Sequence, residues 1–303
     1  MNDDEIANVN GTIARIDRAT VPVTDHGFLY GDSVYETVRT YGRRPFLMER
    51  HLERLERSAS AIHLRLPWSR RRLAGEIDRT LEAARGAGPG GEFAIRVMTT
   101  RGPGPFGYDP DLCPLPTLVI LVRPLNPVSA EDHEIGIPAI VAKLRRNPIE
   151  ALDPRIKSSN LLNNILAAHQ AKDAGAVEAI LLNPAGFLAE GTLTNVFFVK
   201  AGVIRTPSLD CGILSGVTRD LVLDLTTRGG TTIEQGRYRV EDLGSAEEIF
   251  VTSTTKEILP VARLDGRPVG PGGRGPVTRR LQDLFRRRVE EITGGASDPS
   301  EEP

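Results

Sequence analysis

The stretch "RIKSSNLLNNILA", Arg155 to Ala167, places one lysine ahead of a short polar run and an apolar pattern. Residues 161, 162, 165, 166 and 169 recur at helical spacing, which predicts an amphipathic helix that Ser158 or Ser159 caps and Gly175 ends. Lys157 would then precede a helix N-terminus, where the helix dipole and burial lower the pKa of an amine and make it more nucleophilic. An ordinary surface lysine is the alternative interpretation.

Composition and charge narrow the classes of function. The chain has 303 residues, of which 40% are hydrophobic and 26% charged, with a net charge of -2. This balance gives no general attraction to nucleic acid or to an anionic membrane. Two cysteines are too few for a disulfide framework, five histidines show no metal-ligand spacing, and no apolar run reaches membrane-spanning length. We expect a cytoplasmic protein whose partners are small molecules, with no nucleic acid, membrane or metal partner.

Strand-like and helix-like segments along the chain predict an α+β fold with two domains. Residues 33–41, 92–101 and 116–125 are typical of strands, and residues 48–64 and 68–85 of amphipathic helices. A proline-rich and polar stretch then predicts a linker. The predicted ranges are a small N-terminal α+β domain at 1–122, a linker at 123–134, a larger C-terminal domain at 135–293 and a disordered tail at 294–303.

Turn sequences distinguish the sheet types. "NPAG" at 183–186 and "KAG" at 200–202 join predicted strands of the second domain, which favours antiparallel hairpins over a doubly wound parallel sheet. "GAGPGG" at 86–91 matches G-x-G-x-x-G, but it follows a helix and precedes a strand. Because a dinucleotide fingerprint needs strand, turn and helix in that order, we interpret this stretch as a connecting loop.

Two segments are candidates for binding a phosphate. In "GILSGVTRD", Gly216 opens a helix, so the N–H groups of Val217 and Thr218 are available to an anion. In "FVTSTTKEI", a strand ends in hydroxyl residues, including Thr254 and Thr255, which are predicted to begin a helical turn. Each segment alone is also explained as a plain helix cap.

An arginine and a carboxylate complete a possible cofactor site. Arg54 lies on the same predicted helix stripe as His51 and is suited to bidentate phosphate binding, although a surface pair with a glutamate is the alternative. Glu190 in "FLAEGTLTN" precedes a glycine and, if buried, needs a partner such as a protonated ring nitrogen. Lysine, phosphate cradle, arginine and lone carboxylate together match the needs of pyridoxal 5'-phosphate, which uses a lysine Schiff base and a protonated pyridine as electron sink.

Five motifs in order also carry a resemblance: "H..RL" from His51, "IKSSN" around Lys157, "AEGT..N" at Glu190, "GVTRD" at Val217 and "TSTTKEILPV" at Thr254. From about "DHGFLYGDSVYETVR" to "GPVTRRLQ", the chain resembles the fold-type IV pyridoxal-phosphate enzymes, the class IV aminotransferases. The resemblance implies a two-domain homodimer with the active site at the domain interface and the cofactor in the larger domain.

The same resemblance implies roles for individual residues. Lys157 would hold the cofactor covalently and move protons, and Glu190 would pair with the pyridine nitrogen. Leu214 would pack on the ring, and Tyr30 and Tyr35 would line the substrate site. The residues implied in phosphate binding are Arg54, Gly216, Val217, Thr218, Thr254 and Thr255.

The resemblance leaves the substrate open between branches. Arg96 and Arg39 match arginines of branched-chain enzymes. D-amino acid transaminases hold the α-carboxylate with an Arg and a His, and this chain has Phe106 and Tyr108 in their place. Tyr108 is a further candidate for the substrate site. In contrast, "KSSNLLNN" and "VYETVR" resemble the D-amino acid and lyase branches. We favour transamination of a branched-chain L-amino acid with a 2-oxo acid such as 2-oxoglutarate. The alternatives are D-amino acid or (R)-amine transamination, aminodeoxychorismate lyase activity, and a non-catalytic protein that binds phosphate or the cofactor.

Overall fold

A computed structural model describes residues 5–87, 91–228 and 232–294. Residues 88–90 of the predicted loop at 86–91 and residues 295–303 of the predicted tail lie outside these residues, and residues 86 and 87 belong to a helix instead of a loop. The chain forms two compact units. Unit 1 contains the residues up to Asn126, Ile156–Asn160 and those from Ile292; unit 2 contains Pro127–Arg155 and Leu161–Glu291. Both units combine a sheet with helices, so the α+β prediction is confirmed.

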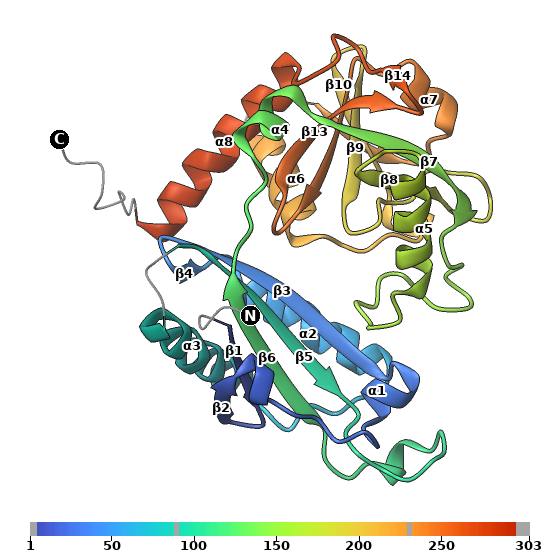
Figure 1. The fold of residues 1–303 in the computed structure, drawn as a ribbon. Coiled ribbons are helices and arrows are strands. Elements are labelled where there is room, and N and C mark those ends of the chain that lie inside the picture. Colours follow the sequence, from blue (N-terminus) through green and yellow to red (C-terminus); the bar gives the residue numbers. More distant parts are fainter. Residues whose placement is uncertain (1–4, 88–90, 229–231, 295–303) are drawn as a thin grey trace, which may run out of the picture. The chain divides into compact units, whose positions relative to one another are not determined.

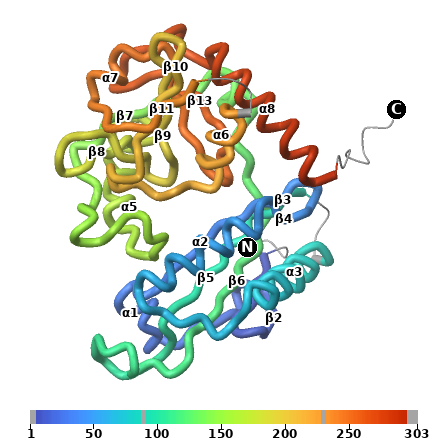
Figure 2. Tube along the Cα trace, turned by 180° about the vertical axis from the view of Figure 1, so that it is seen from behind, coloured from blue at the N-terminus to red at the C-terminus, as the bar shows by residue number. Residues whose placement is uncertain are grey.

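Unit 1 is built on a six-stranded antiparallel sheet with the order β2-β1-β6-β5-β3-β4. Two long helices cover one face of this sheet (Figure 1), as the view from behind also shows (Figure 2). The elements are β1 (Ile6–Val9), β2 (Thr12–Arg15), α1 (His26–Tyr30), β3 (Ser33–Tyr41), β4 (Arg44–Pro45), α2 (Met48–Ala61), α3 (Arg70–Ala87), β5 (Phe93–Thr100) and β6 (Thr117–Pro124), with 3-10 turns at Ile16–Arg18 and Pro110–Leu112.

Alternation along the strands of unit 1 separates a core face from a second, polar face. The core lies between the sheet and the helices α2 and α3, and includes Val34, Val38, Leu52, Leu55, Leu73, Ile77, Ile95, Val97, Ile120 and Val122. Tyr35, Thr37 and Arg39 of β3 alternate with these core residues. Arg96 of β5 stands opposite Thr37 and so shares their face. The predicted substrate residues of these two strands therefore lie on the face away from the helices.

A short segment far along the chain extends the edge of this sheet at the start of β3. Val34 and Ser158 form an antiparallel bridge. Tyr35 N donates to Lys157 O at 3.0 Å, and Ser159 N donates to Ser33 O at 3.0 Å. Lys157 therefore has a position like that of a residue in an edge strand, directly beside Tyr35.

Unit 2 holds a mixed sheet with the order β11-β10-β9-β12-β13-β7-β8, in which β14 also pairs with β13. The pairs β10–β11, β7–β13 and β7–β8 are parallel and the others antiparallel. The elements are α4 (Ala130–Ile135), β7 (Ile137–Arg145), α5 (Leu162–Asp173), β8 (Glu178–Leu182), β9 (Asn195–Lys200), β10 (Val203–Pro207), α6 (Val217–Arg228), β11 (Ile233–Gly236), α7 (Val240–Gly244), β12 (Glu248–Ser253), β13 (Glu257–Leu264), β14 (Arg267–Pro268) and α8 (Pro276–Thr293), with a 3-10 turn at Leu209–Cys211.

The predicted hairpins of unit 2 are confirmed in part. Strands β9 and β10 form an antiparallel hairpin across "KAG". "NPAG" leads from β8 into an isolated antiparallel bridge between Leu182 and Leu188, but β8 itself pairs in parallel with β7. The predicted linker range 123–134 includes most of α4. Within the three described ranges, no helix is long and apolar enough to cross a membrane.

Helix α5 corrects the expectations for the opening stretch. It begins at Leu162 with no side-chain cap, so the prediction of a serine cap is wrong; the backbone of Ser158 and Ser159 pairs with β3 instead. Residues 158–161 separate Lys157 from the helix, so Lys157 does not adjoin its N-terminus. The predicted C-terminus is confirmed, because Gly175 follows the last helical turn with φ +68°.

The apolar face predicted for α5 is not the buried one. Leu162 is 67% exposed, and Ile165 and Leu166 are about half exposed. The helix packs on β7 and β8 (Figure 1) through small residues, chiefly Ala167 and Ala171. Small side chains let the helix approach the sheet closely, which leaves the large apolar residues on the outer face.

Candidate active site

In unit 1, the structure brings three of the predicted site residues together. The Tyr35 ring lies beneath two cations: Lys157 Nζ is 4.6 Å from the ring centroid, and Arg96 Cζ is also 4.6 Å from it. Tyr35 is buried. These cation–π contacts hold the amine and the guanidinium on the same face of the sheet.

The other predicted substrate residues of unit 1 are arranged in two places. Arg39 stacks on the Tyr41 ring at 3.9 Å. Tyr30 contacts the Tyr108 ring edge to face at 5.3 Å, and Gly107 N donates to Tyr30 Oη at 3.4 Å. Tyr108 is 89% exposed on its loop. Tyr30 and Tyr108 thus form a surface pair between α1 and the loop that follows β5.

Arg54 and His51 meet a glutamate that the sequence reasoning missed. Glu36 points from β3 toward α2, where it accepts from Arg54 Nε at 2.7 Å and from Arg54 Nη2 at 2.8 Å. His51 Nδ1 lies 2.7 Å from the same carboxylate. All three side chains are buried. The predicted stripe of His51 and Arg54 is confirmed. The signal for Glu36 was present in the sequence, since it is the only acid in the strand "SVYETVRTY".

The charges around Glu36 fix its ionisation. Burial alone would raise the pKa of Glu36, but the adjacent Arg54 charge and the hydrogen bonds from Arg54 and His51 outweigh it and lower the pKa to about 2. Burial lowers the pKa of His51, although Glu36 opposes this effect. The cluster is therefore a carboxylate–guanidinium pair beside a neutral imidazole.

Acid should destabilise the protein through Glu36. Its pKa in the fold lies near 2 instead of 4.5, and at about 1.4 kcal/mol per pKa unit this corresponds to about 3 kcal/mol of stability. Because the pKa is lowered, this stability is present above pH 4.5 and lost as the pH falls toward 2. Urea unfolding measured between pH 7 and pH 3 should show a steeper loss for the wild type than for Glu36→Gln. Parallel pH profiles for the two proteins would contradict the assignment.

In unit 2, Glu190 has two hydrogen-bond partners, one that follows β7 and one in the loop before α6. Its Oε1 accepts from Arg146 Nε at 2.8 Å, and its Oε2 accepts from Leu214 N at 2.8 Å. Glu190 and Arg146 are both buried. Arg146 follows the carboxyl end of β7, beside the carboxyl end of the parallel strand β8, and such edges commonly form ligand sites. Sequence reasoning missed Arg146 because a basic pair after a strand is usually a solvated turn.

The start of α6 lies close to the Glu190 segment. Asn195 forms an isolated bridge with Glu190 and donates from Nδ2 to Leu214 O at 2.9 Å. A Cβ on Gly216 would lie 2.0 Å from Asn195 Oδ1, so any larger residue would displace the Asn195 side chain. Val217 and Thr218 then open the helix as predicted. Their N–H groups belong to the first turn, which has no intrahelical acceptors and can bind an anion.

The second predicted phosphate segment has a different local structure. Residues 254–256 form the turn between β12 and β13, so the expectation of a helical turn is wrong. Thr254 and Thr255 are half-buried in this turn. Lys256 Nζ lies 3.3 Å from Glu178, which also accepts from Thr192 N at 2.7 Å. Glu178 thus connects the turn with the segment that follows Glu190.

The chemistry of these groups suits pyridoxal 5'-phosphate. A buried carboxylate that pairs with Arg146 fits a protonated ring nitrogen. The first turn of the twelve-residue helix α6 and the threonine hydroxyls fit a phosphate. Lys157 in unit 1 has the amine that the aldehyde requires. Arg54, which was predicted to bind the phosphate, already donates from two of its nitrogens to Glu36.

The chain has relatives along nearly its whole length. The family described as "Amino-transferase class IV" matches residues 33–264. A provisionally named branched-chain-amino-acid aminotransferase of Methanocaldococcus jannaschii is 39% identical over 278 residues, 92% of this chain and 94% of that protein. A D-alanine aminotransferase of Listeria monocytogenes is 35% identical over 287 residues, 94% of this chain and 95% of that protein. The crystal structure of a T.th. branched-chain amino acid aminotransferase with pyridoxamine 5'-phosphate has a TM-score of 0.87 and 29% identity, and the match covers 96% of this chain and 95% of that chain.

Proposed function

Because the chain belongs to the class IV aminotransferase family and is therefore a pyridoxal 5'-phosphate enzyme, we propose that it transfers the amino group of a branched-chain L-amino acid to a 2-oxo acid such as 2-oxoglutarate. The observation that carries the site assignment is the buried Glu190 carboxylate with Arg146 and the Leu214 N–H upon it. The contact of Arg96 with the Tyr35–Lys157 pair supports the substrate assignment, since a guanidinium suits the second carboxylate of glutamate.

In the proposed site, each side chain has a defined task. When bound, the cofactor delocalises the negative charge that develops on the substrate α-carbon. Lys157 would hold the cofactor through its amine; once the substrate amine has replaced it there, the freed Lys157 amine would move a proton to and from the α-carbon. Glu190 would pair with the protonated ring nitrogen, and Arg146 orients the Glu190 carboxylate through its hydrogen bond. The residues proposed for the phosphate are Arg54, Gly216, Val217, Thr218, Thr254 and Thr255, and Leu214 packs on the ring.

The substrate side of the site belongs to residues of unit 1. We assign Arg96 and Arg39 to substrate carboxylates, and Tyr35, Tyr30 and Tyr108 to the walls around the substrate. Arg96 and Arg39 lie on the sheet face that also carries Lys157. This common face supports a substrate bound against the sheet.

The substrate is tested by following the amino group. Purified enzyme with L-leucine and 2-oxoglutarate is expected to form L-glutamate. D-alanine and an (R)-amine should react at least about 100-fold more slowly. In these compounds the two substituents of the carbon that bears the amine change places in the site. Faster turnover of D-alanine would transfer the assignment to the D-amino acid branch, which the 35% identical D-alanine aminotransferase supports. Turnover of none of these would leave the lyase reaction as the assignment within the family.

We also propose that the chain forms a homodimer through an apolar surface of unit 1. Phe28 on α1, and Phe106, Tyr108 and Leu115 on the loop after β5, are large and strongly exposed. The ring contact between Tyr30 and Tyr108 joins α1 with this loop. A surface of this kind on a monomer is unusual and favours burial against a second copy.

Light scattering should give a mass of twice 33.0 kDa. Phe28→Asp should shift the protein toward the monomer, whereas Val177→Asp, at an exposed apolar residue of unit 2, should not. A monomeric wild type would contradict the proposal.

The free thiols of Cys113 and Cys211 support a reducing location such as the cytoplasm. Recovery of the tagged chain from an oxidising compartment would contradict this location.

A further inference from the structure

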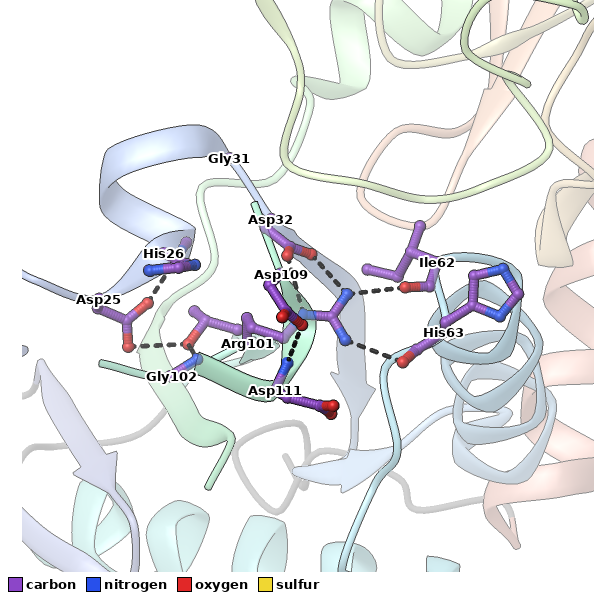
Figure 3. Close-up of polar contacts among 12 residues, drawn as sticks. Asp25, His26, Gly31, Asp32, Ile62, His63, Arg101, Gly102, Asp109 and Asp111 are labelled. Carbon is purple, nitrogen blue, oxygen red and sulfur yellow. Dashed lines mark hydrogen bonds and ion pairs between the residues drawn. The ribbon is translucent and has the colours of Figure 1, made fainter. Parts of the chain in front are cut away.

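Arg101 forms a dense polar cluster in unit 1 (Figure 3). Its Nε and Nη2 donate to the two carboxylate oxygens of Asp32 at 2.8 and 3.0 Å. Its Nη1 donates to the carbonyl of His63 at 2.9 Å, and its Nη2 also donates to the carbonyl of Ile62 at 2.7 Å. The Arg101 side chain is buried. Four hydrogen bonds from one guanidinium make this a rigid junction.

The Arg101 cluster joins two structural elements. Asp32 immediately precedes β3, and its carbonyl also accepts from Arg101 N at 3.0 Å. Ile62 is the C-cap residue of α2 and His63 follows it, so the guanidinium caps the C-terminal carbonyls of that helix. Arg101 therefore fixes the start of β3 against the end of α2.

The Lys157 segment is held by the same two elements. The start of β3 binds it through Tyr35 N and Ser33 O, as described above. The last turn of α2 binds it through Ser58, whose Oγ accepts from Lys157 N at 3.1 Å. Asn160 Nδ2 donates to Gly31 O at 3.0 Å, one residue before Asp32. The distance between β3 and α2 thus determines where the backbone of Lys157 lies.

We propose that Arg101 is a positioning residue for Lys157: it sets the spacing between β3 and α2, and this spacing aims the amine at the cofactor aldehyde. The inference rests on the proposed function, which makes Lys157 the reacting amine. Arg101 binds the elements that hold Lys157, and the proposed site assigns it no contact with the cofactor. Its loss should therefore weaken the bond to Lys157. The contacts of the phosphate and ring should change little, because Arg54 is held separately by two hydrogen bonds to Glu36 and the other residues proposed for the phosphate and ring lie in unit 2.

Two forms of the cofactor separate these effects. Pyridoxal 5'-phosphate binds through phosphate, ring and its covalent bond to Lys157, whereas pyridoxamine 5'-phosphate carries an amine in place of the aldehyde and cannot form that bond. In Arg101→Met, the Kd of pyridoxal 5'-phosphate should rise about tenfold or more, since small displacements of a reacting group have large effects. The Kd of pyridoxamine 5'-phosphate should stay within about twofold of the wild-type value.

Arg274→Met is a matched control. Arg274 is also largely buried and binds Glu134 and Gln282 in unit 2, but it has no assigned role in the site. It should change neither Kd. If Arg101→Met does not fold, Asp32→Asn is measured instead. This change is milder, because the Asp32 side chain is 31% exposed and Arg101 keeps its hydrogen bonds to the carbonyls of Ile62 and His63. The same selective loss, smaller in size, is expected there.

Equal losses for both compounds, or no change in either, would overturn the inference in whichever of the two variants folds. A wild-type protein that binds neither compound would overturn the proposed function as well. The two failures are therefore distinguishable from the wild-type titration alone.

Discussion

Lys157→Ala is expected to lower kcat by about 10²–10⁴-fold, because the variant loses the amine that moves the proton at the α-carbon. The affinity for pyridoxamine 5'-phosphate should change only a few-fold, since that compound binds through its phosphate and ring. Steady-state kinetics and a binding titration of the same preparation measure both effects. Loss of turnover with retained binding would separate a chemical role for Lys157 from a structural one.

Lys172→Ala is the control for this experiment. Lys172 is exposed in the last turn of α5 and has no assigned role. Its removal should leave kcat and cofactor binding unchanged. A Lys157→Ala enzyme within tenfold of wild-type turnover would contradict the assigned role of Lys157, and so would a control with an equal loss.

Glu190→Gln should lower kcat by about 10²–10³-fold, the usual cost of removing one preorganised electrostatic partner from an active site. A neutral amide cannot hold a proton on the ring nitrogen as a carboxylate does. The same change leaves the buried Arg146 charge without its counter-ion. Such a loss typically costs about 3–5 kcal/mol of stability.

Stability and catalysis can be separated at this pair. The double variant Glu190→Gln/Arg146→Met removes the uncompensated charge and should recover much of the unfolding free energy, while kcat stays low. Glu234→Gln is the control, because Glu234 pairs with Arg205 at a half-exposed surface position where a pair contributes little. Recovery of turnover in the double variant would contradict the role assigned to Glu190.

Local pattern predicted the strands and helices of unit 1 closely. The predicted strand at 33–41 has the bounds of β3, and the predicted strands at 92–101 and 116–125 contain β5 and β6. The five ordered motifs also identified the family, which the match over residues 33–264 confirms. These successes share a cause: each depends on residues that are neighbours in the sequence.

The failures have a common cause too. Periodicity predicted a buried apolar face on α5, but the helix packs on β7 and β8 through Ala167 and Ala171, whose small side chains let it approach the sheet closely. Lys157 was expected beside a helix end, whereas its backbone pairs with β3 and Ser58. Glu36 is marked in its strand as the only acid, but nothing near it indicates its partners on α2, and the partner of Arg146 is likewise distant in the sequence. Pairing between distant segments leaves no mark in a local pattern.

If Lys157 carries the cofactor, the bond between them can be trapped chemically and located in the sequence. The enzyme is mixed with pyridoxal 5'-phosphate and reduced with borohydride, and its peptides are mapped by mass spectrometry. The chain has only five lysines, at positions 143, 157, 172, 200 and 256, so the modified residue can be identified without ambiguity. We expect one phosphopyridoxyl group per chain, on Lys157. A group on another lysine, or an unmodified protein, would contradict the account.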